Sequence, residues 1–497
     1  MAAGPPLHLA IDLGAGSGRA MLGRASASGV DLWEVHRFRY APRRVEGHLR
    51  WDWTALLDGL REGIRRAQER ASSLGGQLES VGVDSWGVDY GLVDAQGRLL
   101  EDPICYRDER TAGLVEEVCA RIPSGELFAR TGIQLLSLNT LYQLVAHVRE
   151  GLPRGAACLL LIPDLCHHAL CGSMLTERTN ASTTQLLRVD GAGWDPGLFE
   201  RLGLPMPLMP QVVPAGTELG RLSATYQAEL GVAALRVVAP ATHDTASAIV
   251  GTPLTEGWAY ISSGTWSLVG IERDAPLLGR DVARANFTNE AGACGTVCFL
   301  KNVMGLWILE ACRREWNDAG VRCDHDALVR DAAAIGDHVA LVFPDDPRFF
   351  NPPSMIAELR AYLAETRQPV VDDPVLLTKI ILDSLAFRYA SVLSTIESLT
   401  RRHIPGIHIV GGGALNEYLN QATADAAGRP VLAGPVEATA AGNLLMQAIA
   451  SSEIASLAEA RQLLAHNVRV RRFTPQSSEL RAAAARRYRD LEGRCVA

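Results

Sequence analysis

The pattern of apolar and polar residues predicts a strand–turn–strand start to the chain. Residues 7–13 are mainly apolar and predict a strand, residues 19–23 predict its returning partner, and residues 32–40 alternate like a third strand. Apolar residues at helical spacing predict a helix from Thr54, its expected N-cap, to about Ala71. A dinucleotide-binding unit has a helix directly after its glycine turn, so this order of elements disfavours that fold.

The next segments predict shorter elements. Residues 81–85 predict a short buried strand, and residues 94–97, of sequence DAQG, predict a turn. The remaining expected elements before residue 251 are helices at 139–148 and 163–170, a proline-rich connector without regular structure at 203–216, a strand at 235–239 and a helix that starts at 242–244 and runs to Val250.

From residue 257 the opening order recurs. Residues 259–262 and 267–271 predict paired strands around a small polar turn, and residues 297–301 predict a third strand. Two halves with the same opening indicate a duplicated fold, with domains over 1–250 and 251–497 and a cleft between them. A chain of 497 residues also exceeds one ordinary core. The other expected elements are helices at 305–316 and 374–403, a strand at 407–410, a helix from about Leu415, a strand at 432–433 and a helix from about Thr439.

Composition and charge exclude several classes of protein. Hydrophobic residues make up 47% and charged residues 21%, as in globular proteins, and the net charge of −8 disfavours a nucleic-acid surface. No apolar run is long enough for a membrane span, and no basic segment precedes the first apolar run, which predicts no signal peptide. We expect a cytoplasmic protein, monomer or homodimer, with no nucleic-acid or membrane partner and with unused sequons at Asn180 and Asn286.

Ten cysteines are scattered along the chain without CxxC pairs. Cys166, His167, His168 and Cys171 come closest to the spacing of metal ligands, but no matching pair occurs elsewhere. Packed side chains with reduced thiols are therefore the favoured interpretation.

Three glycine-rich turns are candidate anion-binding sites. The stretch 11–19, IDLGAGSGR, brings Asp12, Ser17 and Arg19 beside glycines that allow backbone amides to converge on an anion. A hairpin that merely needs glycine is the alternative for this stretch. The turns at 262–266 and 411–413 hold corresponding places in the second half and would contact phosphates and a base or ribose. Neither GxGxxG nor GxxxxGK[ST] occurs, so the shared placement favours a different kind of nucleotide site.

His243 and Asp244 open a predicted helix. An aspartate in a first turn is often only a cap. The functional alternative is a general base that accepts the proton of an attacking alcohol, a poor nucleophile that gains from a fixed carboxylate. His243 would then orient or bind the acceptor.

These motifs make the chain similar to the FGGY carbohydrate kinases, which have the actin/hexokinase/Hsp70 fold. The resemblance implies an α/β protein of two duplicated RNase H-like domains with an active-site cleft between them. It covers nearly the whole length and rests on IDLGAGSGR (11–19), GVDSWGVDYGLVD (82–94), YRDERT (106–111), NTLYQL (139–144), TNASTTQLL (179–187), HDTASA (243–248), SSGTWSLVG (262–270), NEAGACG (289–295), LKNVMGLW (300–307) and HIVGGGALN (408–416).

The resemblance implies roles for individual residues. Asp244 matches the catalytic base, His243 matches a substrate contact, and Asp12 is expected to hold Mg²⁺ through water. The expected ATP contacts are Ala15, Gly16, Ser17, Gly18 and Arg19 at the phosphates, Thr265 at the γ-phosphate and Gly412 at the adenosine. The expected sugar contacts are Gly87 and Asn302, with Trp86 and Asp89 in the same pocket, although a core tryptophan is an equal alternative for Trp86.

Two positions depart from the family pattern. The loop GAGSGR lacks the threonine or serine pairs usual in FGGY kinases, so it offers fewer hydroxyl groups. Glu310 stands where related kinases carry glutamine. A carboxylate cannot donate as an amide does and repels phosphate, so we expect Glu310 to contact ATP at the ribose or base.

We therefore expect an ATP- and Mg²⁺-dependent kinase that phosphorylates the 1-hydroxyl of L-rhamnulose in L-rhamnose catabolism. Another ketose or polyol, such as L-fuculose or xylulose, is the alternative substrate because pocket shape sets the stereochemistry. A non-catalytic ATP-binding switch of the actin/Hsp70 type is the third possibility. HDTASA and DSWGVDYG disfavour it, because a switch has no use for a base beside an acceptor pocket.

Overall fold

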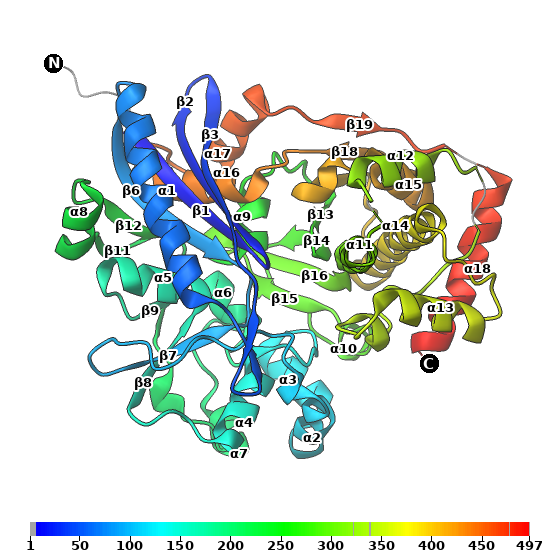
Figure 1. The fold of residues 1–497 in the computed structure, drawn as a ribbon, viewed down its shortest axis with the longest axis horizontal. Helices are drawn as coiled ribbons and strands as arrows, with labels where there is room; N and C mark the ends of the chain where they lie inside the picture. Colours follow the sequence, from blue (N-terminus) through cyan, green and yellow to red (C-terminus); the bar gives the residue numbers. More distant parts are fainter. Residues whose placement is uncertain (1–5, 322, 337–338, 477, 497) are drawn as a thin grey trace. The chain divides into compact units, whose positions relative to one another are not determined.

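The computed structural model describes residues 6–321, 323–336, 339–476 and 478–496, which form two compact units (Figure 1). The first unit comprises the chain up to Pro253 together with Glu272–Phe299 and Glu437–Val468. The second comprises Leu254–Ile271, Leu300–Val436 and the chain from Arg469 onwards. The expected boundary near residue 250 lies close to the end of the first segment, and two later segments pack with the first unit.

The first unit contains a six-stranded sheet of order β11-β12-β6-β1-β2-β3. β1 pairs antiparallel with β2 and parallel with β6, and β2 pairs antiparallel with β3, which confirms the predicted strand–turn–strand start. These strands are β1 (Pro6–Gly14), β2 (Ser17–Ser26), β3 (Gly29–Arg39), β6 (Gln77–Ser85), β11 (Thr217–Arg221) and β12 (Arg236–Ala239). The unit also holds β4 (Arg43–Val45), β5 (His48–Arg50), β7 (Tyr90–Asp94), β8 (Ala156–Leu161), β9 (Leu175–Glu177), β10 (Gln211–Val213) and β15 (Thr288–Ala291).

Helices cover both faces of this sheet (Figure 1). α1 (Trp53–Ser73) approaches β2 closely, because a Cβ on its Gly63 would lie 2.9 Å from that of Ala20. α16 (Ala438–Ala450) packs on the opposite face, where Ala440 joins Ala10 and Met21 in a small apolar cluster. The other helices are α2 (Leu114–Arg121), α3 (Ser124–Thr131), α4 (Thr140–Glu150), α5 (Ile162–Cys171), α6 (Arg178–Thr183), α7 (Pro196–Leu202), α8 (Ala224–Leu230), α9 (Asp244–Val250), α10 (Arg280–Arg284) and α17 (Leu457–Asn467).

The sheet of the second unit repeats this plan in the order β16-β14-β13-β17-β18-β19. β13 pairs antiparallel with β14 and parallel with β17, β17 pairs parallel with β18, and β18 pairs antiparallel with β19. The chain therefore has the expected duplicated α/β fold. The elements are β13 (Ala259–Ser263), β14 (Trp266–Arg273), β16 (Val297–Met304), β17 (Ile407–Val410), β18 (Val431–Ala433), β19 (Arg471–Phe473), α11 (Trp307–Asp318), α12 (His325–Ala333), α13 (Met355–Glu365), α14 (Pro374–Thr400), α15 (Glu417–Ala427) and α18 (Glu479–Val496).

Two local predictions are wrong. Asp52 and not Thr54 caps α1, because the Asp52 carboxylate accepts a hydrogen bond from Ala55 N at 3.1 Å and Thr54 already lies inside the helix. The segment 203–216 contains regular structure, since Gln211–Val213 lacks proline and pairs parallel with β9. Among the described residues, none of the helices combines the length and the apolar character that a membrane crossing requires.

Candidate active site

The first glycine-rich turn is a tight hairpin between β1 and β2. Gly14 pairs with Ser17 across the turn, and Gly16 N donates to Gly14 O at 2.8 Å. The Tyr40 hydroxyl donates to the same carbonyl. A Cβ on Gly18 would lie 2.2 Å from the ring of Phe38, so packing explains this glycine, whereas Gly16 is exposed with open space around it. The turn is therefore a hairpin that leaves room for a ligand at Gly16.

Asp12 and Arg19 lie beside this turn on the face that α16 covers. Arg19 Nη2 is 3.2 Å from Asp12 Oδ2, and Arg19 Nη1 is 2.7 Å from Oε2 of Glu437, the residue before α16. Burial raises the pKa of Asp12 to about 6, and the Arg19 guanidinium opposes this rise. The guanidinium thus bridges two carboxylates, one of which sequence analysis did not assign.

Asp244 is the first residue of α9. Its side chain is 31% exposed, and its Oδ1 accepts a hydrogen bond from Thr245 Oγ1 at 3.1 Å. Partial removal of the carboxylate from water raises the pKa of Asp244 to about 6. Asp244 in turn helps to raise the pKa values of Asp12 and Asp84, so three carboxylates lie within electrostatic reach of one another.

His243 packs between two acidic side chains. Its Nδ1 lies 3.3 Å from Glu290 Oε2, and its Nε2 lies 3.6 Å from Asp244 Oδ1. Burial lowers the pKa of His243, while Glu290 opposes the change, so the ring is neutral at pH 7. A neutral imidazole has one donor and one acceptor nitrogen, which suits a group that orients a hydroxyl.

The loop that carries His243 is held by Glu177 and by Asn180, to neither of which the sequence analysis gave a role in the site. Thr242 N and Oγ1 both donate to Glu177 Oε2 at 2.9 Å. Asn180 Nδ2 lies 3.3 Å from the carbonyl oxygens of both Trp86 and Thr242. The TNAST segment therefore connects the DSWG and HDT motifs, and its polar side chains in a quoted motif were the available signal.

Asp89 organises an aromatic cluster. The carboxylate is 1% exposed, and its Oδ2 accepts hydrogen bonds from Trp51 Nε1 at 2.7 Å, Trp86 Nε1 at 3.0 Å and Tyr106 N at 3.1 Å. Its Oδ1 accepts from Gln143 Nε2 at 2.9 Å. Protein donors thus contact both oxygens, which fixes the orientation of the Asp89 carboxylate beside Trp86.

Trp86 and Gly87 lie at the centre of this region. Trp86 is 7% exposed, and its ring centroid lies 4.5 Å from that of Trp51. A Cβ on Gly87 would lie 2.7 Å from Thr183 Oγ1, so α6 approaches the backbone closely here. Trp86 is largely a packed side chain, in keeping with the alternative that the sequence left open.

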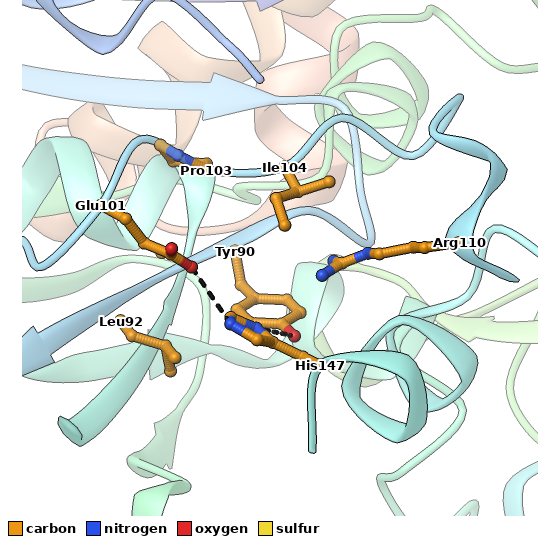
Figure 2. A pocket seen from close by; sticks show the side chains of 8 residues that line it. Tyr90, Leu92, Glu101, Pro103, Ile104, Arg110 and His147 are labelled. Atoms are coloured by element: carbon orange, nitrogen blue, oxygen red, sulfur yellow. Dashed lines mark hydrogen bonds and ion pairs between the residues drawn. The ribbon is translucent and has the colours of Figure 1, made fainter. Parts of the chain in front are cut away.

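A small polar pocket lies beside the Asp89 network (Figure 2). His147 connects two of its walls, with Nδ1 3.0 Å from the Tyr90 hydroxyl and Nε2 3.1 Å from Glu101 Oε1. Arg110 Nη2 donates to Gln143 Oε1 at 3.1 Å. Nε and Nη1 of Arg110 have no hydrogen-bond partner in the described chain. Because the pocket leaves essentially no room for even a water molecule, it supports the Asp89 region and does not provide a substrate site.

The two expected nucleotide turns of the second unit lie against each other. A Cβ on Gly413 would lie 2.0 Å from Ser263 Oγ, and Gly411 has a φ of +79°, which favours glycine. The Thr265 carbonyl accepts from Gly305 N and Trp307 N at 3.2 Å. Gly412 is exposed, and a Cβ there would meet nothing within 4 Å, so space for a ligand remains beside it.

The two other expected contacts of the second unit lie on different elements. Asn302 is half-buried on β16. Glu310 is exposed in the first turn of α11, where it forms an ion pair of 2.7 Å with Arg313. This local pairing is a sufficient structural reason for a carboxylate at position 310.

The side chains of His167, His168 and Cys171 form hydrogen bonds with main-chain groups. His167 Nε2 accepts a hydrogen bond from Val83 N at 3.0 Å, and burial lowers the pKa of His167 to about 3. His168 lies 2.8 Å from Gly97 O and 3.0 Å from Ser173 O. The histidines are therefore packed side chains, as interpreted from the sequence.

Comparison with known proteins identifies the family. Residues 7–251 match the N-terminal domain of the FGGY family of carbohydrate kinases, and residues 259–451 match its C-terminal domain. The chain belongs to the FGGY family of carbohydrate kinases. It is accordingly an ATP-using kinase with a small-molecule sugar as substrate, and the family disfavours the non-catalytic switch.

Several curated proteins similar to the chain are rhamnulokinases. The chain is 38% identical to the rhamnulokinase of Bacillus subtilis over 95% of its own length and 96% of the relative. It is 42% identical to the rhamnulokinase of Pectobacterium carotovorum, over 97% and 96% of the two lengths, and 41% identical to that of Enterococcus faecalis, over 91% of each.

Solved structures of other sugar kinases share the fold. A gluconate kinase from Lactobacillus acidophilus matches with a TM-score of 0.79 at 15% identity, covering 99% of this chain and 98% of that chain. A Plasmodium falciparum glycerol kinase with ADP matches with a TM-score of 0.76 at 14% identity, covering 100% and 99%. At these identities the likeness concerns the fold alone.

Proposed function

We propose that this kinase transfers the γ-phosphoryl group of ATP to the 1-hydroxyl of L-rhamnulose, giving L-rhamnulose 1-phosphate and ADP. The observation that carries the proposal is the half-exposed Asp244 carboxylate at the start of α9, in a chain about 40% identical to several rhamnulokinases. The aromatic cluster around Trp86 is the proposed wall of the sugar pocket, with Gly87, His243 and Asn302 as further sugar contacts.

Asp244 is the proposed general base. A carboxylate with an exposed oxygen is able to accept the proton of the attacking hydroxyl as that proton becomes acidic in the transition state. The neutral His243 imidazole, whose Nδ1 lies 3.3 Å from Glu290 Oε2, supports the orientation of the acceptor. Positioning and charge stabilisation then supply most of the rate enhancement, because phosphoryl transfer needs little covalent help from the protein.

Asp12 is the proposed ligand of Mg²⁺ through water. The fit is good, because Asp12 supplies carboxylate oxygen, and one oxygen of the neighbouring Asp84 has no hydrogen-bond partner in the described chain. Mg²⁺ prefers oxygen ligands and usually keeps several waters beside one or two carboxylates. When bound, it neutralises charge on the β- and γ-phosphates.

The proposed ATP contacts divide between the units. Ala15 to Arg19 in the first unit, and Thr265 and Gly412 in the second, are the proposed phosphate and adenosine contacts. Exposed Gly16 and the open space at Gly412 support these assignments. Glu310 has a pairing partner of its own, so we place it last among the proposed contacts.

A coupled ADP-release assay over a ketose panel tests the proposed function. We expect the largest kcat/KM for L-rhamnulose, with smaller values for L-fuculose and D-xylulose, because an altered stereocentre leaves polar pocket groups unpaired. A larger value for another ketose would identify a different substrate. ADP release that does not depend on any sugar would overturn the assignment of Asp244 as a base.

The activity is expected to fall below about pH 6. The pKa of Asp244 is raised to about 6, so the protonated form, which cannot accept a proton, persists to higher pH than for an ordinary aspartate. kcat/KM should fall about tenfold for each pH unit below pH 6 and level off above about pH 7. Initial rates between pH 4.5 and 8 check this, and a flat profile down to pH 5 would contradict it.

Replacing Glu437 with glutamine is expected to lower the KM for ATP. Glu437 holds Arg19 Nη1 at 2.7 Å, so the substitution removes a competitor for the guanidinium and a negative charge near the proposed phosphates. For a half-exposed ion pair we expect about a fivefold effect that shrinks at high salt. Glu453→Gln, at the other end of α16, is the control, and an unchanged or higher KM for ATP would contradict the expectation.

A further inference from the structure

A continuous hydrogen-bonded chain crosses the first unit beneath the carboxylates. Asn443 Nδ2 donates to Asp84 Oδ2 at 2.5 Å and to Gly82 O at 3.1 Å. Gln447 Nε2 donates to Asn443 Oδ1 at 2.7 Å and to Leu9 O at 2.9 Å. Ser80 Oγ donates to Gln447 Oε1 at 2.6 Å and lies 2.7 Å from His8 Nδ1. His8 Nε2 in turn lies 3.1 Å from Oε1 of Glu453, which is at the surface.

The strand register places this chain and the carboxylates on one face. His8 pairs with Ser80, Ala10 with Gly82, and Asp12 with Asp84 along parallel strands β1 and β6. Side chains two apart on a strand share a face, so all six residues face α16. A Cβ on Gly82 would lie 2.8 Å from Asn443 Oδ1, and this small residue lets the helix come close enough to bond.

Asp84 differs from Asp89, another buried carboxylate of the region. Both have almost no exposed surface, but Asp89 receives four hydrogen bonds, whereas Asp84 Oδ1 has no partner in the described chain. An unpartnered buried oxygen is costly, and a purely structural carboxylate would have both oxygens satisfied, as Asp89 does. Asp84 therefore keeps one oxygen available beside Asp12.

The orientation of Asn443 is fixed by its neighbours. Its amide oxygen accepts from Gln447, so its NH₂ group must point to Asp84. We propose that Asn443 is a positioning residue that holds Asp84, and with it the Asp12–Asp84 pair, in the geometry that binds the Mg²⁺–nucleotide complex. This inference rests on the proposed ATP and Mg²⁺ site.

The test compares Asn443→Leu with Ser80→Ala in the full-length protein. Asn443→Leu removes three buried hydrogen bonds of the network and Ser80→Ala removes two, but only the first substitution removes a bond to Asp84. We expect Asn443→Leu to raise the Mg²⁺ concentration for half-maximal ADP binding, measured by calorimetry without sugar, about tenfold. Ser80→Ala should lower the melting temperature without that change, and the KM for the sugar should stay within about twofold in both variants.

A charge-exchanged double variant separates positioning from simple packing. Asp84→Asn combined with Asn443→Asp keeps a hydrogen bond between the two positions but moves the carboxylate onto α16. We expect the melting temperature to recover relative to Asn443→Leu while the Mg²⁺ requirement stays high. Recovery of the wild-type Mg²⁺ requirement, or equal requirements in Asn443→Leu and Ser80→Ala, would overturn the proposal.

The readout is independent of the sugar. If the wild-type protein fails to phosphorylate L-rhamnulose, the proposed substrate is wrong, but the Mg²⁺ dependence of ADP binding still tests Asn443. If ADP binding by the wild-type protein does not depend on Mg²⁺, the proposal for Asn443 is overturned whichever sugar is the substrate.

Discussion

Replacing Asp244 with asparagine is expected to lower kcat about 10²- to 10⁴-fold and to leave the fold intact. Asparagine has nearly the same shape but cannot accept a proton from the sugar hydroxyl. Because the residue is half-exposed and accepts one side-chain hydrogen bond, from Thr245, the loss of charge should cost little stability. Steady-state ADP release and the melting temperature measure the two effects separately.

Asp281→Asn is the matched control for this variant. Asp281 is also an acidic residue in the first turn of a short helix of the first unit, and it is exposed. The kcat of the two variants distinguishes a structural cap from a catalytic base. If Asp244 were only a cap, both variants would lose a little stability and keep their kcat, which would exclude the proposed role.

Replacing Gly442 with alanine is expected to destabilise the first unit and to impair catalysis. A Cβ on Gly442 would lie 1.8 Å from Ser247 O, so the backbones of α16 and α9 touch at this point. Alanine favours a helix over glycine by about 1 kcal/mol, but a contact this short forces the helices apart and costs about 3 kcal/mol. Because α9 begins with Asp244, displacement of the base should lower kcat about 10²-fold.

Urea unfolding and kcat measure these two consequences. Gly493→Ala in α18 is the control, because that glycine is also in a helix and a Cβ there would meet no atom within 4 Å. The control should be as stable as the wild type or slightly more so. A Gly442→Ala protein of wild-type stability would mean that α9 and α16 separate at no cost.

Much of the fold follows from local pattern. Short, mainly apolar runs at residues 7–13 and 259–262 predicted the two repeated openings, and the structure has both. The helix start was harder, because Asp52 and Thr54 are both good caps on either side of Trp53, and only the backbone geometry decides between them. The pairing of β10 with β9 was not predictable either, because a three-residue strand has no period of its own.

In the site, too, local motifs were predictable from the sequence and long-range contacts were not. Asp12 and Asp244 stand in motifs with a chemical reason of their own, and the sequence proposed both. The link between Asp84 and Asn443 joins residues 359 positions apart, and Asn443 and Gln447 form a polar stripe on α16 that the pattern alone would place toward water and not against the sheet. One signal of this link was present in β1 and β6. His8 and Asp12 in β1, and Ser80 and Asp84 in β6, are polar residues within largely apolar, buried strands.

The late position of α16 in the chain has a consequence for synthesis. Gln447 and Leu9, which it bonds, are 438 positions apart, so β1 leaves the ribosome long before the helix that covers it exists. During that interval one face of β1 and β6 meets water. A face built from histidine, serine and aspartate tolerates this delay, whereas an apolar face would invite aggregation. The polar network thus suits a nascent first unit that must wait for nearly the whole chain before it closes.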